Sequence, residues 1–226
     1  MAWNNDDPQY AEAMSFYLAG DWSKANTAFS ELAKQNPKDG FVQLLRGNIL
    51  YSLGKLDDSV EAYEAAVAIS PDLGVAYYKL GVCYYRMGNL EQALNAFSTV
   101  SKVGSESHAM ASYFVGLINL FLGRDMAADE AFTAFRKQSP ESQIANFYLA
   151  QLKMKQKAYA DALPLLEELV QGNPGFAEVH YMLGVVQYGL HNNTEAIRSF
   201  QRALELNPED ERSKTKLTLL TDVQWP

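Results

Sequence analysis

Cysteine is nearly absent from this chain, which has one such residue, Cys83, among its 226. A single cysteine cannot form an internal disulfide, so no disulfide framework supports the fold. This usage is compatible with a reducing cytoplasm. Because no base lies beside Cys83 in the sequence, we interpret it as a small, semi-buried side chain rather than as a reactive thiol.

The chain also has few of the residue patterns that build catalytic or metal sites. Its histidines, His108, His180 and His191, lack the close spacing that places two ligands on one helix face. No glycine-rich phosphate loop is present, and the carboxylate pairs Asp57-Asp58 and Glu167-Glu168 are expected near helix starts or on outer faces. We therefore expect no catalytic residues, no metal site and no cofactor, and predict that the protein is not an enzyme.

Basic residues are outnumbered, with 19 Lys and Arg against 27 Asp and Glu, a net charge of -8. Nucleic acids and anionic membrane surfaces reward clustered Lys and Arg, so we expect neither as a partner. No apolar run approaches the length that spans a bilayer, so we expect no membrane insertion. Residues 1–7 show no basic segment followed by an apolar run, which predicts no signal peptide and a cytoplasmic location. A secreted chain with its leader removed would have the same sequence.

What the chain does contain is an internal repeat. Small residues recur every 34 or 35 positions, a second small residue follows twelve positions later, and a bulky residue follows four positions after that. The three series are Ala13, Gly47, Gly81, Gly116, Ala150 and Gly184; Ala25, Ser59, Ala93, Ala128, Ala162 and Ala196; and Phe29, Tyr63, Phe97, Phe132, Leu166 and Phe200. Prolines close most units, at Pro37, Pro71, Pro140, Pro174 and Pro208.

This pattern predicts a pair of antiparallel helices in each unit. Two helices approach closely only where small side chains lie at their crossing, and a large side chain one turn later fills the remaining space. The residue before a proline is disfavoured in a helix, so the second helix of a unit should end at Asn36, Ser70, Ser139, Asn173 and Asn207. Turns such as Leu53-Gly54-Lys55 should separate the two helices, each about a dozen residues long.

The pattern resembles that of the tetratricopeptide repeat family, which has a 34-residue period. The third unit shows the family residues best, at Tyr77, Leu80-Gly81, Tyr84, Ala93 and Phe97. The sixth unit has Leu183-Gly184, Ala196, Phe200, Ala203 and Pro208. The resemblance implies an all-α fold, an α-solenoid of antiparallel helix hairpins that acts by binding protein.

We predict one quasi-linear domain that buries its core between neighbouring repeats. The expected organisation is an N-terminal tail at 1–5, six repeats within 6–208, and a capping helix with a tail at 209–226. The approximate repeats are 6–39, 40–73, 74–108, 109–142, 143–176 and 177–208. The third repeat ends with a one-residue insertion, where Val103-Gly104-Ser105-Glu106-Ser107 replaces the proline turn. This segment is either an altered turn or a hinge between the two halves.

In this family the first helix of each repeat lines the concave face, and ligands contact its second, fifth, ninth and twelfth positions. In the four central repeats the second position is apolar, where the family is usually polar. These positions predict a peptide-binding groove formed by Phe41, Leu44, Asn48, Tyr51, Val75, Tyr78, Val82, Tyr85, Met110, Tyr113, Leu117, Ile144, Phe147 and Gln151. So much contiguous apolar surface favours a covering partner, namely an apolar or amphipathic peptide segment. Alternatively, these side chains pack locally within an unusually apolar solenoid.

Two functions remain open at this level. The chain is either an adaptor that holds a segment of another protein, or a scaffold that self-associates into homo-oligomers, as organelle-coating members of the family do. The carboxylate clamp with which some members bind chaperone C-termini is not reproduced, because Tyr78 and Val82 occupy positions that the clamp requires to be polar or basic. A chaperone co-factor role is therefore disfavoured.

Overall fold

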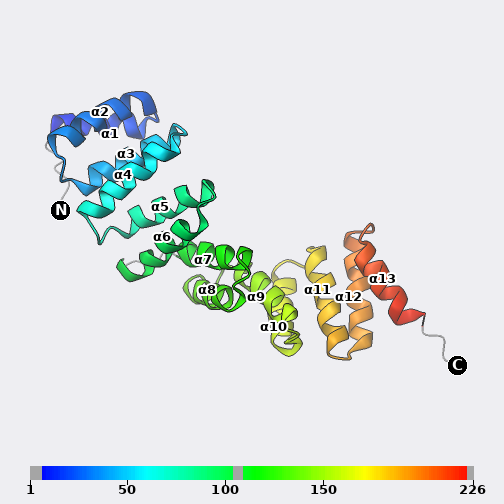
Figure 1. Cartoon of the computed structure of the whole chain (residues 1–226). Coiled ribbons are helices and arrows are strands. Elements are labelled where there is room, and N and C mark those ends of the chain that lie inside the picture. Colours follow the sequence, from blue (N-terminus) through cyan, green and yellow to red (C-terminus); the bar gives the residue numbers. More distant parts are fainter. Residues whose placement is uncertain (1–6, 104–108, 223–226) are drawn as a thin grey trace. The chain divides into compact units, whose positions relative to one another are not determined.

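The computed structural model describes residues 7–103 and 109–222, which form thirteen α-helices and no strand. The predicted N-terminal tail (1–5), most of the insertion turn (104–107) and the C-terminal end (223–226) lie outside the described residues. The chain divides into two compact units, 1–118 and 119–226, and the division falls within one helix, α7. Figure 1 shows the succession of helices along the chain.

The first unit is a series of antiparallel helix pairs. Its helices are α1 (Pro8–Leu18), α2 (Trp22–Gln35), α3 (Gly40–Ser52), α4 (Leu56–Ile69), α5 (Gly74–Arg86), α6 (Leu90–Val103) and the greater part of α7 (Ala109–Phe121). From α1 to α6 each helix packs against the next one in sequence, and α3 also contacts α5. The first helices of the second and third repeats are thus neighbours, as a helical solenoid requires.

The second unit continues the same alternation. Its remaining helices are α8 (Asp125–Gln138), α9 (Ile144–Lys155), α10 (Tyr159–Gly172), α11 (Ala177–Gly189), α12 (Asn193–Leu206) and α13 (Glu211–Thr221). From α8 to α13 each helix contacts the next. The expected capping helix is α13, which packs on α12 and buries Ser213 completely. Together these helices confirm the predicted all-α solenoid with a C-terminal cap.

The core lies where the two helices of a pair cross. All members of the second small series and all members of the bulky series are buried. A Cβ added at Gly81 would lie 2.8 Å from the ring of Phe97, and one added at Gly184 would lie 2.6 Å from the ring of Phe200. The small residues therefore permit the close helix contact that the repeat pattern predicted.

The helix ends follow local chain chemistry. The second helices end at Asn36, Ser70, Ser139, Asn173 and Asn207, as predicted from the prolines that follow. The turns within pairs use a left-handed backbone, with φ of 71° to 78° at Gly20, Gly54, Gly88 and Gly123. The equivalent residues of the last two pairs are Lys157, with φ 59°, and His191, with φ 64°. These two turns have the same geometry without glycine, which the sequence pattern did not reveal.

Candidate functional site

The predicted groove residues lie on the first helices of their pairs and divide between the two units. The second unit holds Ile144, Phe147 and Gln151 on α9. The first unit holds the others, on α3, α5 and α7: Phe41, Leu44, Asn48, Tyr51, Val75, Tyr78, Val82, Tyr85, Met110, Tyr113 and Leu117. A single groove that joins both sets stays a prediction.

Most of these side chains are half-buried, which leaves part of each available for contact. Met110 is 44% exposed, Ile144 40% and Tyr85 38%. Leu44 differs from the rest, because it is only 4% exposed and belongs to the core. Leu44 therefore presents little surface to a ligand.

An aromatic cluster in the first unit brings several predicted residues together around Phe114 on α7. The Phe114 ring stacks on Phe97 at a centroid distance of 4.8 Å and lies 5.3 Å from Tyr85 and 5.7 Å from Tyr113. Tyr78 lies 6.4 Å from the same ring. Aromatic pairs at these distances contribute about 0.5–1.5 kcal/mol beyond the area they bury. The cluster fixes the orientation of the α5 and α7 side chains.

Phe114 was missed by the sequence analysis. It occupies the sixth position of its repeat, where the other repeats have Ala11, Leu45, Lys79, Tyr148 and Met182. Because this position varies so widely, its periodicity gives no signal. Tyr148 plays a similar part in the second unit, where it stacks on Phe132 at 4.8 Å.

Asn48, a predicted ligand-binding residue, already has partners in the fold. The Tyr63 hydroxyl donates to Asn48 Oδ1 at 2.8 Å, and Asn48 Nδ2 donates to the Tyr17 hydroxyl oxygen at 3.3 Å. Burial raises the pKa of Tyr63 well above its usual value, so its hydroxyl stays protonated as a donor. A ligand would have to compete with these bonds, which makes Asn48 a structural link between α1, α3 and α4.

The exposed side of α5 carries two cations. Val75, Lys79, Val82 and Arg86 follow one another at spacings of four, three and four residues, so they lie on one face of the helix. The Arg86 Cζ lies 4.8 Å from the ring centroid of Tyr51 on α3. This cation–π contact joins two neighbouring first helices at the surface. We call these four residues the α5 strip.

The second unit holds cations over its first-helix tyrosines as well. Arg212 of α13 lies 4.2 Å from the Tyr181 ring centroid, and Lys216 lies 5.7 Å from that of Tyr188. Arg212 also binds Glu178 at 2.6 Å and Asp210 at 2.8 Å. The hydrogen bond to Glu178, followed by the one to Asp210, raises the pKa of Arg212. The capping helix thus covers part of α11.

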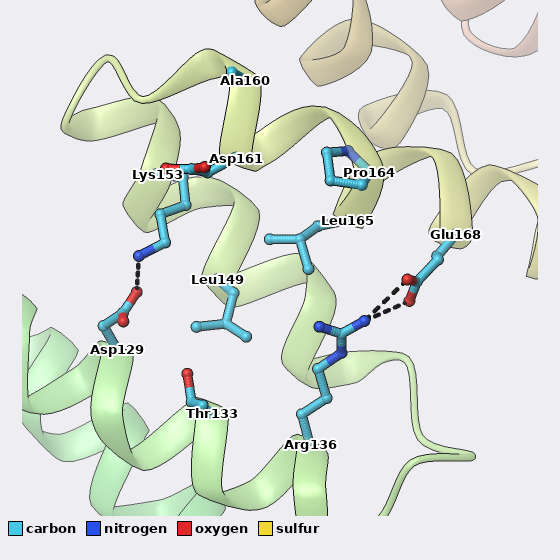
Figure 2. A pocket seen from close by; sticks show the side chains of 10 residues that line it. All are labelled: Asp129, Thr133, Arg136, Leu149, Lys153, Ala160, Asp161, Pro164, Leu165 and Glu168. Atoms are coloured by element: carbon cyan, nitrogen blue, oxygen red, sulfur yellow. Dashed lines mark hydrogen bonds and ion pairs between the residues drawn. The ribbon is translucent and has the colours of Figure 1, made fainter.

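A pocket of about 310 Å³ lies between α8, α9 and α10 of the second unit (Figure 2). Its lining consists of Asp129, Thr133, Arg136, Leu149, Lys153, Ala160, Asp161, Pro164, Leu165 and Glu168. Two ion pairs cross it, Lys153–Asp129 at 2.7 Å and Arg136–Glu168 at 2.9 Å. Glu168 also accepts a hydrogen bond from Asn146 Nδ2 at 2.7 Å. These contacts tie α8 to α9 and α10.

The thiol of Cys83 is buried and lies 3.6 Å from the Ser59 hydroxyl. Burial raises the pKa of this thiol, which disfavours the reactive thiolate. Cys83 is more deeply buried than the sequence suggested and packs as a core residue.

Within 7–103 and 109–222, no helix combines the length and apolar character needed to cross a bilayer. In the same part of the chain, no three His, Cys, Asp or Glu residues are arranged to hold a metal ion.

Three solved structures resemble the fold. YrrB, described as a TPR protein with an unusual peptide-binding site, gives a TM-score of 0.74 at 19% identity over 83% of this chain and 96% of its own. MamA protein gives 0.65 at 19% identity, over 83% of this chain and 97% of its own. A tetratricopeptide repeat protein from Parabacteroides merdae gives 0.55 at 17% identity, over 94% and 82%. At these identities the likeness shows the fold alone.

Sequence comparison adds the family. The TPR repeat-containing protein MJ1428 of Methanocaldococcus jannaschii is 27% identical over 177 residues, 78% of this chain and 27% of that protein. The chain therefore matches about a quarter of this relative's length. Family models for the TPR or tetratricopeptide repeat match residues 9–39, 47–88, 75–102, 121–177 and 153–220. The chain belongs to the tetratricopeptide repeat family, a family of protein-interaction scaffolds.

Proposed function

We propose that this protein is a non-enzymatic adaptor that holds an apolar or amphipathic segment of a partner protein against its first helices. The observation that carries the proposal is the surface of the first unit formed by α3, α5 and α7. We call this surface the first-helix face of that unit. It carries the partly exposed residues Tyr51, Val75, Tyr78, Val82, Tyr85, Met110, Tyr113 and Leu117.

The side chains of this surface are less buried than those that fill the core. The residues that fill the helix crossings are fully buried, whereas Tyr85 and Met110 remain exposed beside half-buried Val82 and Leu117. Apolar side chains that a fold leaves partly open in one area are typical of a binding surface. Each well-buried apolar anchor of a ligand would contribute about 1.5–3 kcal/mol before the costs of association.

The same proposal assigns no catalytic step to the chain. The only thiol, Cys83, is buried with a raised pKa, and the ion pairs of the pocket in the second unit serve to connect helices. A cytoplasmic location stays a prediction from the sequence.

The test is affinity capture from native extract with the wild-type protein and with a Val82→Glu, Leu117→Glu variant, followed by mass spectrometry. We expect a partner that the variant fails to retain. The matched control is Leu18→Glu, Met126→Glu, which places the same two charges at residues that are each 78% exposed, one at the end of α1 and one in α8. Far-UV circular dichroism must show that the variants fold. Identical captures by the wild-type protein and by a folded double variant would contradict the proposal.

Self-association is the second candidate function, and one observation favours it. The terminal helix α13 leaves Leu219 57% exposed, although a capping helix should present a polar outer face. A second copy of the chain that packs on α13 would cover this side chain. Sedimentation velocity over a range of concentrations separates the two candidates. Growth into larger species that is abolished by Leu219→Lys would support the self-associating scaffold. A monomer at all concentrations would support the adaptor.

A further inference from the structure

We propose that the first-helix face of the first unit selects peptides that carry acidic side chains among apolar ones. This inference rests on the proposed adaptor function and names the chemistry of its partner. It is supported by the distribution of charge on the surface where that function places the ligand.

The α5 strip alternates apolar and cationic side chains along the exposed side of its helix. Val75, Lys79 and Val82 are half-buried, and Arg86 is exposed. The opposite side of α5 carries Leu80 and Tyr84, which are buried. The strip is therefore the part of α5 that a ligand meets first.

Within 7–103 and 109–222, the two cations of the strip have no carboxylate partner. Arg86 rests on the Tyr51 ring, a contact that engages one face of its guanidinium group. The described residues form no ion pair with Arg86 or with Lys79. Elsewhere in the protein, Arg136, Lys153 and Arg212 do have such partners. The hydrogen-bond donors of Lys79 and Arg86 are thus available to an anionic group of a ligand.

The neighbouring helices do not neutralise this charge. Neither α3 nor α7 contains an Asp or Glu. The acidic residues of the adjoining segments lie on the second helices, at Asp57, Asp58, Glu61 and Glu64 of α4 and Glu91 of α6, and in the turns before α3 and α5, at Asp39 and Asp72. Glu64 accepts a hydrogen bond from Tyr84, which is on the side of α5 opposite the strip. In a chain of net charge -8, this face is locally positive.

The spacing of the cations limits the ligand further. Lys79 and Arg86 are seven residues apart in a helix, which corresponds to about 10.5 Å along its axis. An extended peptide covers this distance in about three residues, and a helical one in about seven. A fitting segment therefore has two acidic side chains at one of these spacings, with an apolar side chain between them to contact Val82.

Charge on an accessible surface acts mainly on specificity and on the rate of association. Each exposed ion pair is individually weak, so the loss of one cation should weaken binding by about twofold to fivefold. Added salt should have a similar effect, because it screens such pairs.

The experiment measures binding of the full chain to three sets of fluorescein-labelled peptides of about twelve residues. The sets share the same Leu, Phe and Ile positions and carry Glu, Gln or Lys at the remaining positions, with the charged residues three or seven apart. Fluorescence anisotropy is recorded for the wild-type protein, for a Lys79→Gln, Arg86→Gln variant, and for Val82→Glu. The matched control is Lys38→Gln, Lys55→Gln, which removes the same charge at exposed residues outside the α5 strip.

We expect the Glu set to bind about fourfold to twenty-fivefold more tightly than the Gln set, and the Lys set to bind most weakly. Lys79→Gln, Arg86→Gln should abolish the preference for Glu, and the control should keep it. Arg86→Lys keeps the positive charge, so it should retain part of the preference for Glu. This variant separates the effect of the charge from the effect of lost packing on Tyr51. Unchanged melting temperatures would confirm that the variants fold.

The outcomes separate this inference from the function on which it rests. Equal binding of all three sets, abolished by Val82→Glu, would overturn the acidic preference and leave the adaptor function standing. A preference for Glu that survives Lys79→Gln, Arg86→Gln would also overturn the assignment to the α5 strip. If no set binds, both proposals fail for this face.

Discussion

Gly81 on α5 and Phe97 on α6 approach so closely that a Cβ added at Gly81 would lie 2.8 Å from Cδ1 of the Phe97 ring. We predict that Gly81→Ala destabilises the protein by about 1–3 kcal/mol, because the ring must move within a filled core. The gain in helix propensity from glycine to alanine, about 1 kcal/mol, offsets only part of this cost. Urea denaturation followed by circular dichroism measures the difference.

A double-mutant cycle identifies the cause. In the fifth repeat the equivalent position is Ala150, and the bulky partner is Leu166 rather than an aromatic ring. Phe97→Leu should therefore relieve the clash, so the double variant Gly81→Ala, Phe97→Leu should be more stable than the sum of the single changes predicts. Strict additivity would show that Gly81 is required for a reason other than its contact with Phe97.

A substitution at His191 is expected to stabilise the protein, in contrast to the one at Gly81. This residue adopts a left-handed backbone with φ 64°, at the position where four other repeats have glycine. A side chain in this region is strained by about 1 kcal/mol, since its Cβ approaches the following carbonyl. We predict that His191→Gly stabilises the protein by up to about 1 kcal/mol, and that Lys157→Gly does the same. Gly88→Ala, at φ 78°, is the reverse control and should destabilise it.

Much of this fold could be predicted because the information is local and periodic. The close contact of Gly81 with Phe97, the helix end at Asn207 before Pro208 and the cap at α13 all follow from residue types at fixed spacings. The left-handed turns at Lys157 and His191 could not be predicted, because the usual signal is a glycine and neither turn has one. Both turns are closed by backbone hydrogen bonds, from Ala158 N to Lys153 O at 2.8 Å and from Asn192 N to Gln187 O at 2.9 Å.

The candidate site could be predicted from the sequence less completely than the fold. The expected groove residues do lie on first helices, but the sequence could not show that Leu44 is buried or that Asn48 is held by two tyrosines. These outcomes depend on side chains from other helices. The two hydrogen-bond partners of Asn48, Tyr63 and Tyr17, lie fifteen and thirty-one residues from it in the sequence. The role of the groove residues in binding stays a prediction.

The Glu168 carboxylate has two hydrogen-bond partners that should contribute unequally to stability. Arg136 Nη2 donates to both of its oxygens at 2.9 Å, and Asn146 Nδ2 donates to one at 2.7 Å. Asn146 is only 4% exposed, whereas Arg136 reaches solvent. Glu168→Leu should therefore cost about 1–3 kcal/mol, because it leaves a buried amide donor unsatisfied. Arg136→Leu should cost less than about 1 kcal/mol, because it removes an exposed ion pair.

Two further variants test this explanation through chemical denaturation. Glu168→Gln retains an oxygen that can accept from Asn146, so it should recover most of the stability lost in Glu168→Leu. Glu167→Leu changes the adjacent, exposed carboxylate and should alter the free energy of unfolding by less than about 0.5 kcal/mol. Equal costs for Glu168→Leu and Arg136→Leu would show that the ion pair, rather than the amide, determines the stability of this contact.

Tyr84 predicts how stability depends on pH in the alkaline range. Burial, together with the hydrogen bond to Glu64, raises the pKa of Tyr84 from 10.0 to about 12. The protonated phenol is favoured in the folded state, so its contribution is fully present below pH 10 and is lost as pH rises from 10 to about 12. The loss amounts to at most about 3 kcal/mol, the equivalent of a shift of two pKa units.

The measurement is the free energy of unfolding from pH 8 to pH 12 for the wild-type protein and for Tyr84→Phe. We expect Tyr84→Phe to be less stable than the wild-type protein at pH 8, because it lacks the hydrogen bond to Glu64, and to lose less stability on going to pH 12. Tyr85→Phe, a change at an exposed ring on the same helix, is the matched control and should follow the wild-type curve. Titration of phenol absorbance provides an independent check, because Tyr84→Phe should remove one tyrosine that ionises near pH 12 in the folded protein. If Tyr84→Phe and the wild-type protein lose stability equally between pH 10 and 12, the pKa of Tyr84 is the same in the folded and unfolded states. The alkaline sensitivity must then come from other tyrosines such as the half-buried Tyr10, whose pKa burial also raises to about 12.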